Sequence, residues 1–180
     1  LMPITSKTKT LICNNSDIHS DVIKRCHTVI GDSIDIEQLF KSTGISNWGE
    51  MKHLITSFEE FSQEVESDFS EKLNLSIYKG WGIVGVAPMI SVNTPDYVGK
   101  DIAGKELFQQ SNNPNSVGRP LPGIAVKIMA EGSGVSANSP NTVGRIFIKG
   151  ALLSSKKLTD SDWIETPFIG SIDERGFIVI

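Results

Sequence analysis

Apolar residues change their spacing near the middle of the chain. Short apolar runs typical of buried strands occupy residues 53–56 and 75–80, and between them apolar positions from Phe58 to Leu73 recur every three or four residues. An earlier strand-like run at 9–13 is followed by helical spacing over 18–30 and over 34–40. Strand, helix, strand in this order predicts parallel βαβ units, with functional loops at the carboxyl ends of the strands.

Polar residues predict where these helices begin and end. Ser57 is expected to cap the helix that follows residue 56, and Glu60 three residues later completes a capping box. Asn15 or Ser16 is expected to cap the helix over 18–30, which Gly31 would end.

The second half of the chain has a different pattern. After Pro95 the helical spacing disappears, and strand-like runs follow turn-rich segments, at 123–129, 143–150 and 176–180. Short strands at regular spacing predict a small twisted sheet or open barrel. The expected fold class is therefore an α/β lobe followed by a small β-rich lobe. We expect an α/β subdomain over 1–97, a connecting segment over 98–115 and a β-rich subdomain over 116–180.

A dense turn precedes the first of these late strands. Residues 116–126 read SVGRPLPGIAV, and proline fixes φ where glycine frees it. The bend is expected to be well defined, and its structural residues are Arg119, Pro120, Pro122 and Gly123. Arg119 either braces the interface between the lobes or binds a ligand.

Composition narrows the function classes. The 180 residues carry a net charge of −4, and no basic cluster balances the acids between Glu59 and Glu71, so a nucleic-acid partner is not expected. Those acids are expected to form a solvated helix face, with docking of a basic partner as the alternative.

Cys13 and Cys26 make no disulfide framework, which favours a reduced cytoplasmic setting. The three histidines form no ligand cluster, so no metal site is predicted from them. We see no signal peptide and no apolar run of about 20 residues.

Four segments in order resemble one family. They are residues 52–61, 75–96, 116–128 and 162–180, and they are similar to the AMP-forming acyl-adenylate (acyl-CoA synthetase-like) superfamily. The SVNTPD run at 91–96 and the VGRPLPG turn favour the branch of bacterial acyl–acyl-carrier-protein synthetases and 2-acylglycerophosphoethanolamine acyltransferases. The resemblance implies an ATP- and magnesium-dependent enzyme that activates a fatty acyl substrate and passes it to a carrier thiol, either CoA or a carrier protein.

The family is longer than this chain. Its phosphate-binding loop is expected before residue 1, and its mobile C-terminal domain after residue 180. The resemblance therefore implies no catalytic residue in this chain, which would be inactive alone and would depend on the remaining parts of the parent protein. Association with a membrane through that parent stays open.

The matched motifs depart from the family pattern. Where the family has a Thr-Glu pair whose glutamate binds magnesium, this chain has Val84 and Gly85, which offer no side-chain oxygen. Phe168 replaces an aspartate that binds the ribose hydroxyls. By resemblance, the substrate and nucleotide pocket comprises Ser57, Phe58, Glu59, Gly80, Trp81, Gly82, Val84, Gly85 and Phe168.

These departures leave alternatives open. Phe58 either fills the adenine position or begins the apolar helix face, and Trp81 either packs in the core or lines the pocket. The protein is expected to be a fragment of an acyl-activating enzyme. The alternative is a family member that has lost adenylation and acts as a binding or scaffold domain, and a third reading is a pocket for an acyl chain without nucleotide.

Overall fold

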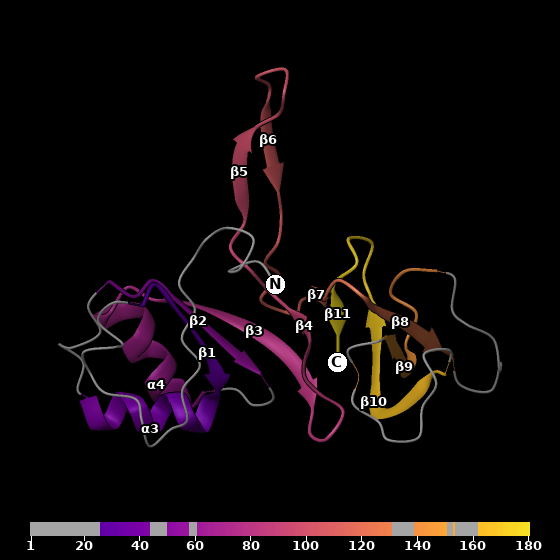
Figure 1. Ribbon diagram of the computed structural model, residues 1–180, viewed down its shortest axis with the longest axis horizontal. Coiled ribbons are helices and arrows are strands. Elements are labelled where there is room, and N and C mark those ends of the chain that lie inside the picture. The colour runs from indigo at the N-terminus through magenta and orange to yellow at the C-terminus, as the bar shows by residue number, and fades with distance from the viewer. Residues whose placement is uncertain (1–25, 44–49, 58–60, 131–138, 151–152, 154–161) are drawn as a thin grey trace.

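The described part of the computed structural model contains two larger β-sheets and one separate β-hairpin (Figure 1). The structure describes residues 26–43, 50–57, 61–130, 139–150, 153 and 162–180. Helices and strands alternate at first, as β1 (Thr28–Asp32), α3 (Ser33–Thr43), β2 (His53–Ser57), α4 (Gln63–Ser67), the π-helix η3 (Asp68–Lys72) and β3 (Ser76–Ile83). Strands follow, as β4 (Ala87–Val92), β5 (Tyr97–Lys100), β6 (Glu106–Gln109), β7 (Arg119–Pro120), β8 (Ile124–Met129), β9 (Gly144–Gly150), β10 (Ile164–Ile172) and β11 (Ile178–Val179).

The first sheet has the strand order β1-β2-β3-β4-β7, and β1, β2 and β3 are parallel. Val29, Leu54 and Ile77 are register partners across these three strands, and all three pack into one apolar cluster with the helices. Phe69 is the centre of the helical side, because its ring is fully buried and meets Phe40 edge to face at 4.8 Å between centroids. The helices therefore cover the Leu54 face of the sheet, and the predicted parallel βαβ unit is confirmed.

The helix predicted over 18–30 is wrong for its last residues. Thr28, Val29 and Ile30 belong to β1, which pairs in register with β2. Three successive β-branched side chains favour an extended backbone, and the neighbouring strand supplies hydrogen bonds that a helix would have to give up. The strand predicted over 9–13 and the rest of that helix lie outside the described residues.

The prediction that Ser57 caps a helix is also wrong. Ser57 is the buried last residue of β2 and the register partner of Gly80, and α4 begins only at Gln63. The apolar face predicted for the helix is present, since Phe61, Val65 and Phe69 are buried. Glu60 lies outside the described residues. None of the helices in the described part of the chain is long and apolar enough to cross a membrane.

The second sheet is antiparallel, with the strand order β11-β10-β9-β8. Its inward side chains, including Ile128, Ile146 and Ile148, form one apolar cluster with Trp81 and Ile90 from the first sheet. Each sheet thus contributes one face to a shared core. The predicted fold class, an α/β part followed by a β-rich part, is confirmed.

Strands β5 and β6 form a hairpin that extends away from both sheets (Figure 1). Asp101 closes its turn, because its Oδ1 accepts hydrogen bonds from the backbone N–H groups of Ala103 and Lys105 at 2.8 and 2.9 Å. The segment predicted as a plain connection over 98–115 therefore contains regular strands of its own.

Candidate functional site

Two parallel strands, β1 and β2, end side by side at one edge of the first sheet, opposite Gly80 in the third parallel strand. Asp32 ends β1 and is the register partner of Ser57, which ends β2 and is in turn the register partner of Gly80 in β3. In open parallel sheets, ligands bind just outside the carboxyl ends of the strands. This edge is therefore the candidate site on topological grounds.

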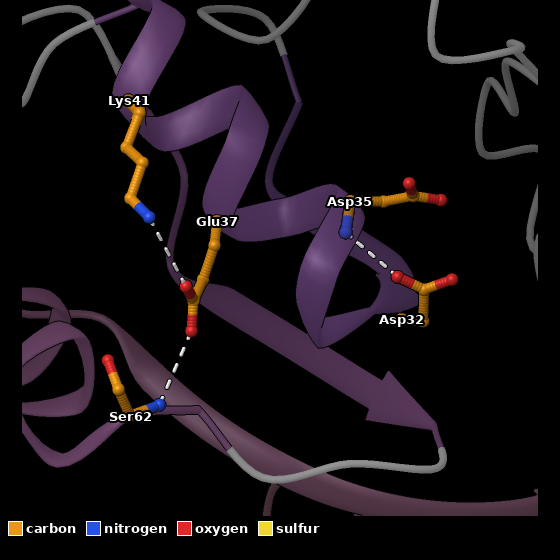
Figure 2. Close-up of polar contacts among 5 residues, drawn as sticks. All are labelled: Asp32, Asp35, Glu37, Lys41 and Ser62. Atoms are coloured by element: carbon orange, nitrogen blue, oxygen red, sulfur yellow. Dashed lines mark hydrogen bonds and ion pairs between the residues drawn. The ribbon is translucent and has the colours of Figure 1, made fainter.

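Asp32 is a carboxylate at this edge that is absent from the set predicted from the sequence. Its Oδ1 accepts a hydrogen bond from the backbone N–H of Asp35 at 2.8 Å, so the side chain caps the start of α3 (Figure 2). The β-branched run before Gly31 is the signal that would have placed Asp32 at a strand end. Because Oδ1 of Asp32 already accepts this helix-capping hydrogen bond, we assign Asp32 a structural role.

Helix α3 is also tied to the segment that follows β2. Glu37 Oε1 accepts a hydrogen bond from the backbone N–H of Ser62 at 3.3 Å, and Glu37 Oε2 lies 3.7 Å from Lys41 Nζ (Figure 2). These contacts hold the N-terminal end of α4 against α3. The helices behind the candidate edge therefore keep a fixed arrangement.

Gly80 and Gly82 lie where neighbouring strands approach closely. A Cβ on Gly80 would lie 3.0 and 3.1 Å from the carbonyl oxygens of Thr56 and Ser91, and a Cβ on Gly82 would lie 2.3 Å from the carbonyl oxygen of Pro88. Both residues belong to β3, which continues to Ile83 and pairs with β4. The strand therefore extends beyond residue 80, where the predicted apolar run ends.

The loop connecting β3 and β4 is a short turn with Val84 and Gly85 at its tip. Val84 is 86% exposed, and Gly85 has a φ of +78° with open space around its Cα. These residues correspond by resemblance to the magnesium-binding positions, yet neither supplies an oxygen ligand. Gly85 also has a left-handed backbone that disfavours a glutamate. Among the described residues, no group of three histidine, cysteine, aspartate or glutamate side chains is placed to hold a metal ion. These residues do not fit a magnesium site.

Trp81 and Phe168 meet between the two sheets. Their ring centroids are 5.5 Å apart with an interplanar angle of 85°, an edge-to-face contact. Trp81 is 4% exposed, and its indole Nε1 has no hydrogen-bond partner among the described residues. Phe168 packs against the same apolar cluster. Phe168, which the sequence comparison predicted to lie in the nucleotide pocket, is therefore part of an aromatic contact between the sheets.

Thr166 fixes the strand that carries Phe168. Its hydroxyl donates to the carbonyl oxygen of Ile146 at 2.9 Å and accepts from the backbone N–H of Phe168 at 3.3 Å. The register of β10 shifts between Glu165 and Ile169, so this stretch bulges away from regular pairing with β9. A buried threonine thus holds an irregular strand in place beside the aromatic contact.

The proline-rich bend connects the two sheets. Arg119 and Pro120 form β7 and pair with β4 of the first sheet. The Leu121 carbonyl oxygen accepts from the Ile124 N–H at 3.0 Å, and Pro122 followed by Gly123 at a φ of +86° is the residue pattern of a type II turn. The bend therefore leads from the first sheet directly into β8.

Arg119 contacts the second sheet from this bend. Its Nε donates to the carbonyl oxygen of Arg175 at 2.9 Å, and its guanidinium lies 4.3 Å from the centroid of the Phe177 ring. Arg175 is also linked to Gln110 by a side-chain hydrogen bond. These contacts of Arg119 join β7 to the turn before β11.

A buried polar cluster holds the neighbouring turn at 113–118. Asn93 is fully buried, and its amide donates to the carbonyl oxygens of Lys79 and Ser116 at 3.0 and 2.9 Å. Its Oδ1 accepts from the backbone N–H of Asn113 at 2.9 Å, and the Asn113 side chain reaches Asp173. This chain of hydrogen bonds runs from β3 to the β10–β11 turn. Nothing in the polar pattern of the sequence pointed to Asn93.

The structure brings together part of the predicted pocket. Ser57 and Gly80 are adjacent by register, and Trp81 contacts Phe168. Gly82 lies in the same strand as Trp81, whereas Val84 and Gly85 lie at the exposed turn beyond it. Phe58 and Glu59 lie outside the described residues.

Comparison with known proteins supports a common fold. The chain is 23% identical over 116 residues to 2-succinylbenzoate–CoA ligase of Oceanobacillus iheyensis, a match that covers 59% of this chain and 21% of the relative. Apo MatB from Rhodopseudomonas palustris superposes with a TM-score of 0.64 at 19% identity, covering 93% of this chain and 33% of MatB. A long-chain-fatty-acid–CoA ligase from Archaeoglobus fulgidus superposes with a TM-score of 0.62 at 16% identity, covering 99% of this chain and 39% of the ligase. No family model matches the sequence.

The fold is that of an acyl-CoA ligase. The fold expected from the resemblance to the AMP-forming superfamily is therefore confirmed. This chain spans about a fifth of the length of the curated relative and a third or slightly more of the two solved structures. The two sheets described above thus correspond to one part of an acyl-CoA ligase fold.

Proposed function

We propose that the chain is part of a member of the AMP-forming acyl-adenylate superfamily, in the branch of acyl–acyl-carrier-protein synthetases and acylglycerophosphoethanolamine acyltransferases. The whole protein would activate a fatty acyl substrate with ATP and magnesium and transfer the acyl group to CoA or a carrier protein. The observation that carries this proposal is the shared two-sheet fold with a fatty-acid–CoA ligase over 99% of the chain. The four motif segments in the same order support it.

In this proposal the chain supplies a scaffold for the pocket. The crowded glycines Gly80 and Gly82, together with Trp81, shape its floor, and the bend at Arg119–Gly123 positions the second sheet. We further propose the division into 1–97, 98–115 and 116–180 and a cytoplasmic location. The chemical step belongs to the parts of the protein that flank these residues in the resembled family.

Calorimetry on the full-length parent tests this function. The parent should bind ATP with magnesium, or a non-hydrolysable acyl-sulfamoyl adenylate, with the binding heat lost when the adenylate mimic is added first. Adenosine, the nucleoside without phosphates, provides the control for nonspecific heat. Absence of binding by both ATP and the mimic would contradict the proposal.

A second candidate function is a binding or scaffold domain that has lost adenylation. The Trp81–Phe168 contact favours it, because an aromatic side chain replaces a carboxylate at the ribose position and offers no acceptor. Leaving buried polar groups of a ligand unpaired costs roughly 1–3 kcal/mol for each group, more where charge is involved. The turn at Val84 and Gly85 adds a second loss, at the magnesium positions.

Restoration of the family residues distinguishes these functions. Val84→Thr, Gly85→Glu and Phe168→Asp are introduced together in the full-length parent, and ATP-to-AMP turnover is compared with that of the unaltered protein. Gain of turnover only in the restored variant supports the second candidate. Turnover by the unaltered parent at the same rate as the restored variant overturns it and supports the first.

A further inference from the structure

The outward face of the second sheet concentrates cations and aromatic rings. Side chains alternate along its strands, so those of Ile128, Ile146 and Ile148 point into the shared core while their neighbours point away from it. The outward set contains Lys127, Arg145, Phe147, Lys149 and Glu165, and Trp163 joins it just before β10. We call these six residues the outer face.

Contacts within the outer face give it a definite geometry. Lys127 and Phe147 are register partners, and Phe147 is also the partner of Glu165 across β10. Lys127 Nζ lies 4.3 Å from the Trp163 ring centroid and 5.3 Å from that of Phe147. The aliphatic stem and charge of Lys127 therefore hold two rings in place, which lowers the entropy that a binding partner would have to remove.

The cations of the outer face outnumber its carboxylate. Arg145 Nε lies 3.4 Å from Glu165 Oε1, and this pair leaves Lys127 and Lys149 without an ion-pair partner in the described chain. This excess of positive charge stands out in a protein with a net charge of −4.

The residue types on this face are those of protein interfaces. Arginine and aromatic residues are enriched at the centre of protein–protein contacts, and tryptophan and arginine dominate their binding energy. Trp163 remains 36% exposed and Glu165 is exposed, whereas Lys127, Arg145, Phe147 and Lys149 are half-buried. The face thus combines exposed aromatic area with uncompensated positive charge.

We propose that the outer face docks an acidic segment of a partner protein, with carboxylates placed on Lys127 and Lys149 and an apolar side chain against Trp163. Glu165 favours a protein over a nucleic acid, because a continuous phosphate backbone would meet that carboxylate, whereas a protein segment can place a cation or amide there. The rings already engaged by Lys127 are also poorly placed to stack on bases. This proposal does not depend on the proposed function.

Titration with a defined probe tests the docking proposal. The probe is a short glutamate-rich peptide that carries leucines, compared with its glutamine analogue, and the readout is amide chemical shifts of the full chain. Shifts should concentrate in β8, β9 and β10 and should weaken with salt, since the screening length falls from about 30 to about 3 Å between 0.01 and 1 M. The glutamine analogue should cause much smaller shifts.

Matched substitutions locate the contact. Lys127→Met with Lys149→Met keeps the apolar stems and removes two charges, and it should weaken peptide binding roughly tenfold. Lys52→Met with Lys100→Met removes two exposed lysines elsewhere and should leave binding unchanged. Trp163→Phe should weaken binding at any salt concentration.

Three outcomes would overturn the proposal. If the peptide changes no amide chemical shifts, or changes only those outside the second sheet, then the outer face does not bind the peptide. Tighter binding of a single-stranded RNA than of the peptide, lost in the double-lysine variant, would make the face a nucleic-acid site. Self-association of the chain without peptide, abolished by the same variant, would identify a second copy as the occupant.

Discussion

The Phe168 ring stands edge-on to the Trp81 indole, 5.5 Å away between centroids, and so connects a strand of the second sheet to a strand of the first. Such pairs add about 0.5–1.5 kcal/mol beyond the area that they bury. The contact therefore stabilises the junction between the sheets.

Replacing Phe168 by aspartate should destabilise the chain. The substitution removes the ring contact and places a carboxylate against an apolar cluster, at a cost of about 2 kcal/mol in the free energy of unfolding. Urea denaturation followed by circular dichroism measures this change. The neighbouring Ile169→Asp is the control, because Ile169 is 46% exposed and should tolerate the charge. Equal stability of the two variants would show that the aromatic contact contributes nothing.

Two glycines near the bend should respond differently to alanine. Gly118 and Gly123 both have positive φ, at +88° and +86°, so alanine is strained at either position. A Cβ on Gly118 would lie 1.9 Å from the backbone carbonyl carbon of Val92, whereas one on Gly123 would meet nothing within 4 Å. Gly123→Ala should therefore cost about 1 kcal/mol and Gly118→Ala at least about 3 kcal/mol. Thermal or urea unfolding of both variants checks this order, and equal losses would contradict it.

The sequence predicted the order and type of the helices and strands better than the residues at which they begin and end. Apolar periodicity identified α3, α4, β8 and β9, because each has one face in a core, and a continuous apolar run identified β2, whose last four residues are all buried. Periodicity failed at Thr28–Asp32, because the apolar residues there fit a helical spacing and also form a β-branched run. Pairing with β2 decides in favour of the strand. Long-range pairing of this kind leaves no local signal.

The candidate site was predictable only where a motif marks it. Gly80 and Gly82 are visible as glycines, but their crowding depends on the backbone of Ser91 and Pro88 in β4, across a hairpin that periodicity did not reveal. Asn93 carries no signal in isolation, since a polar residue after a strand is normally solvated. Its buried hydrogen bonds exist only because the turn at 113–118 returns to it.

Removal of the Asn93 side chain should loosen this turn. Asn93→Ala leaves the carbonyl oxygen of Ser116 and the N–H of Asn113 without their buried side-chain partner, whereas the carbonyl oxygen of Lys79 keeps its bond to the backbone N–H of residue 93. Each orphaned group costs about 1–3 kcal/mol, so the free energy of unfolding should fall by at least about 2 kcal/mol. Hydrogen exchange should accelerate at Asn113 and Ser116 in particular. Asn115→Ala, which lies exposed in the same turn, should leave both measurements near those of the unaltered chain.

His53 should make the stability of the chain depend on pH. Burial lowers its pKa below the ordinary value of 6.5, and the nearby Lys52 and His27 lower it further. The unfolded chain therefore binds a proton near pH 6.5 that the folded chain does not yet bind, so the free energy of unfolding decreases as the pH falls below about 6.5. His53→Phe keeps a ring against Tyr78, whose centroid lies 5.5 Å from that of His53, and removes the titrating group. The variant should lose less stability than the unaltered chain between about pH 7 and 5. A nuclear magnetic resonance titration of the His53 ring checks the cause directly, because a midpoint at or above 6.5 would exclude it.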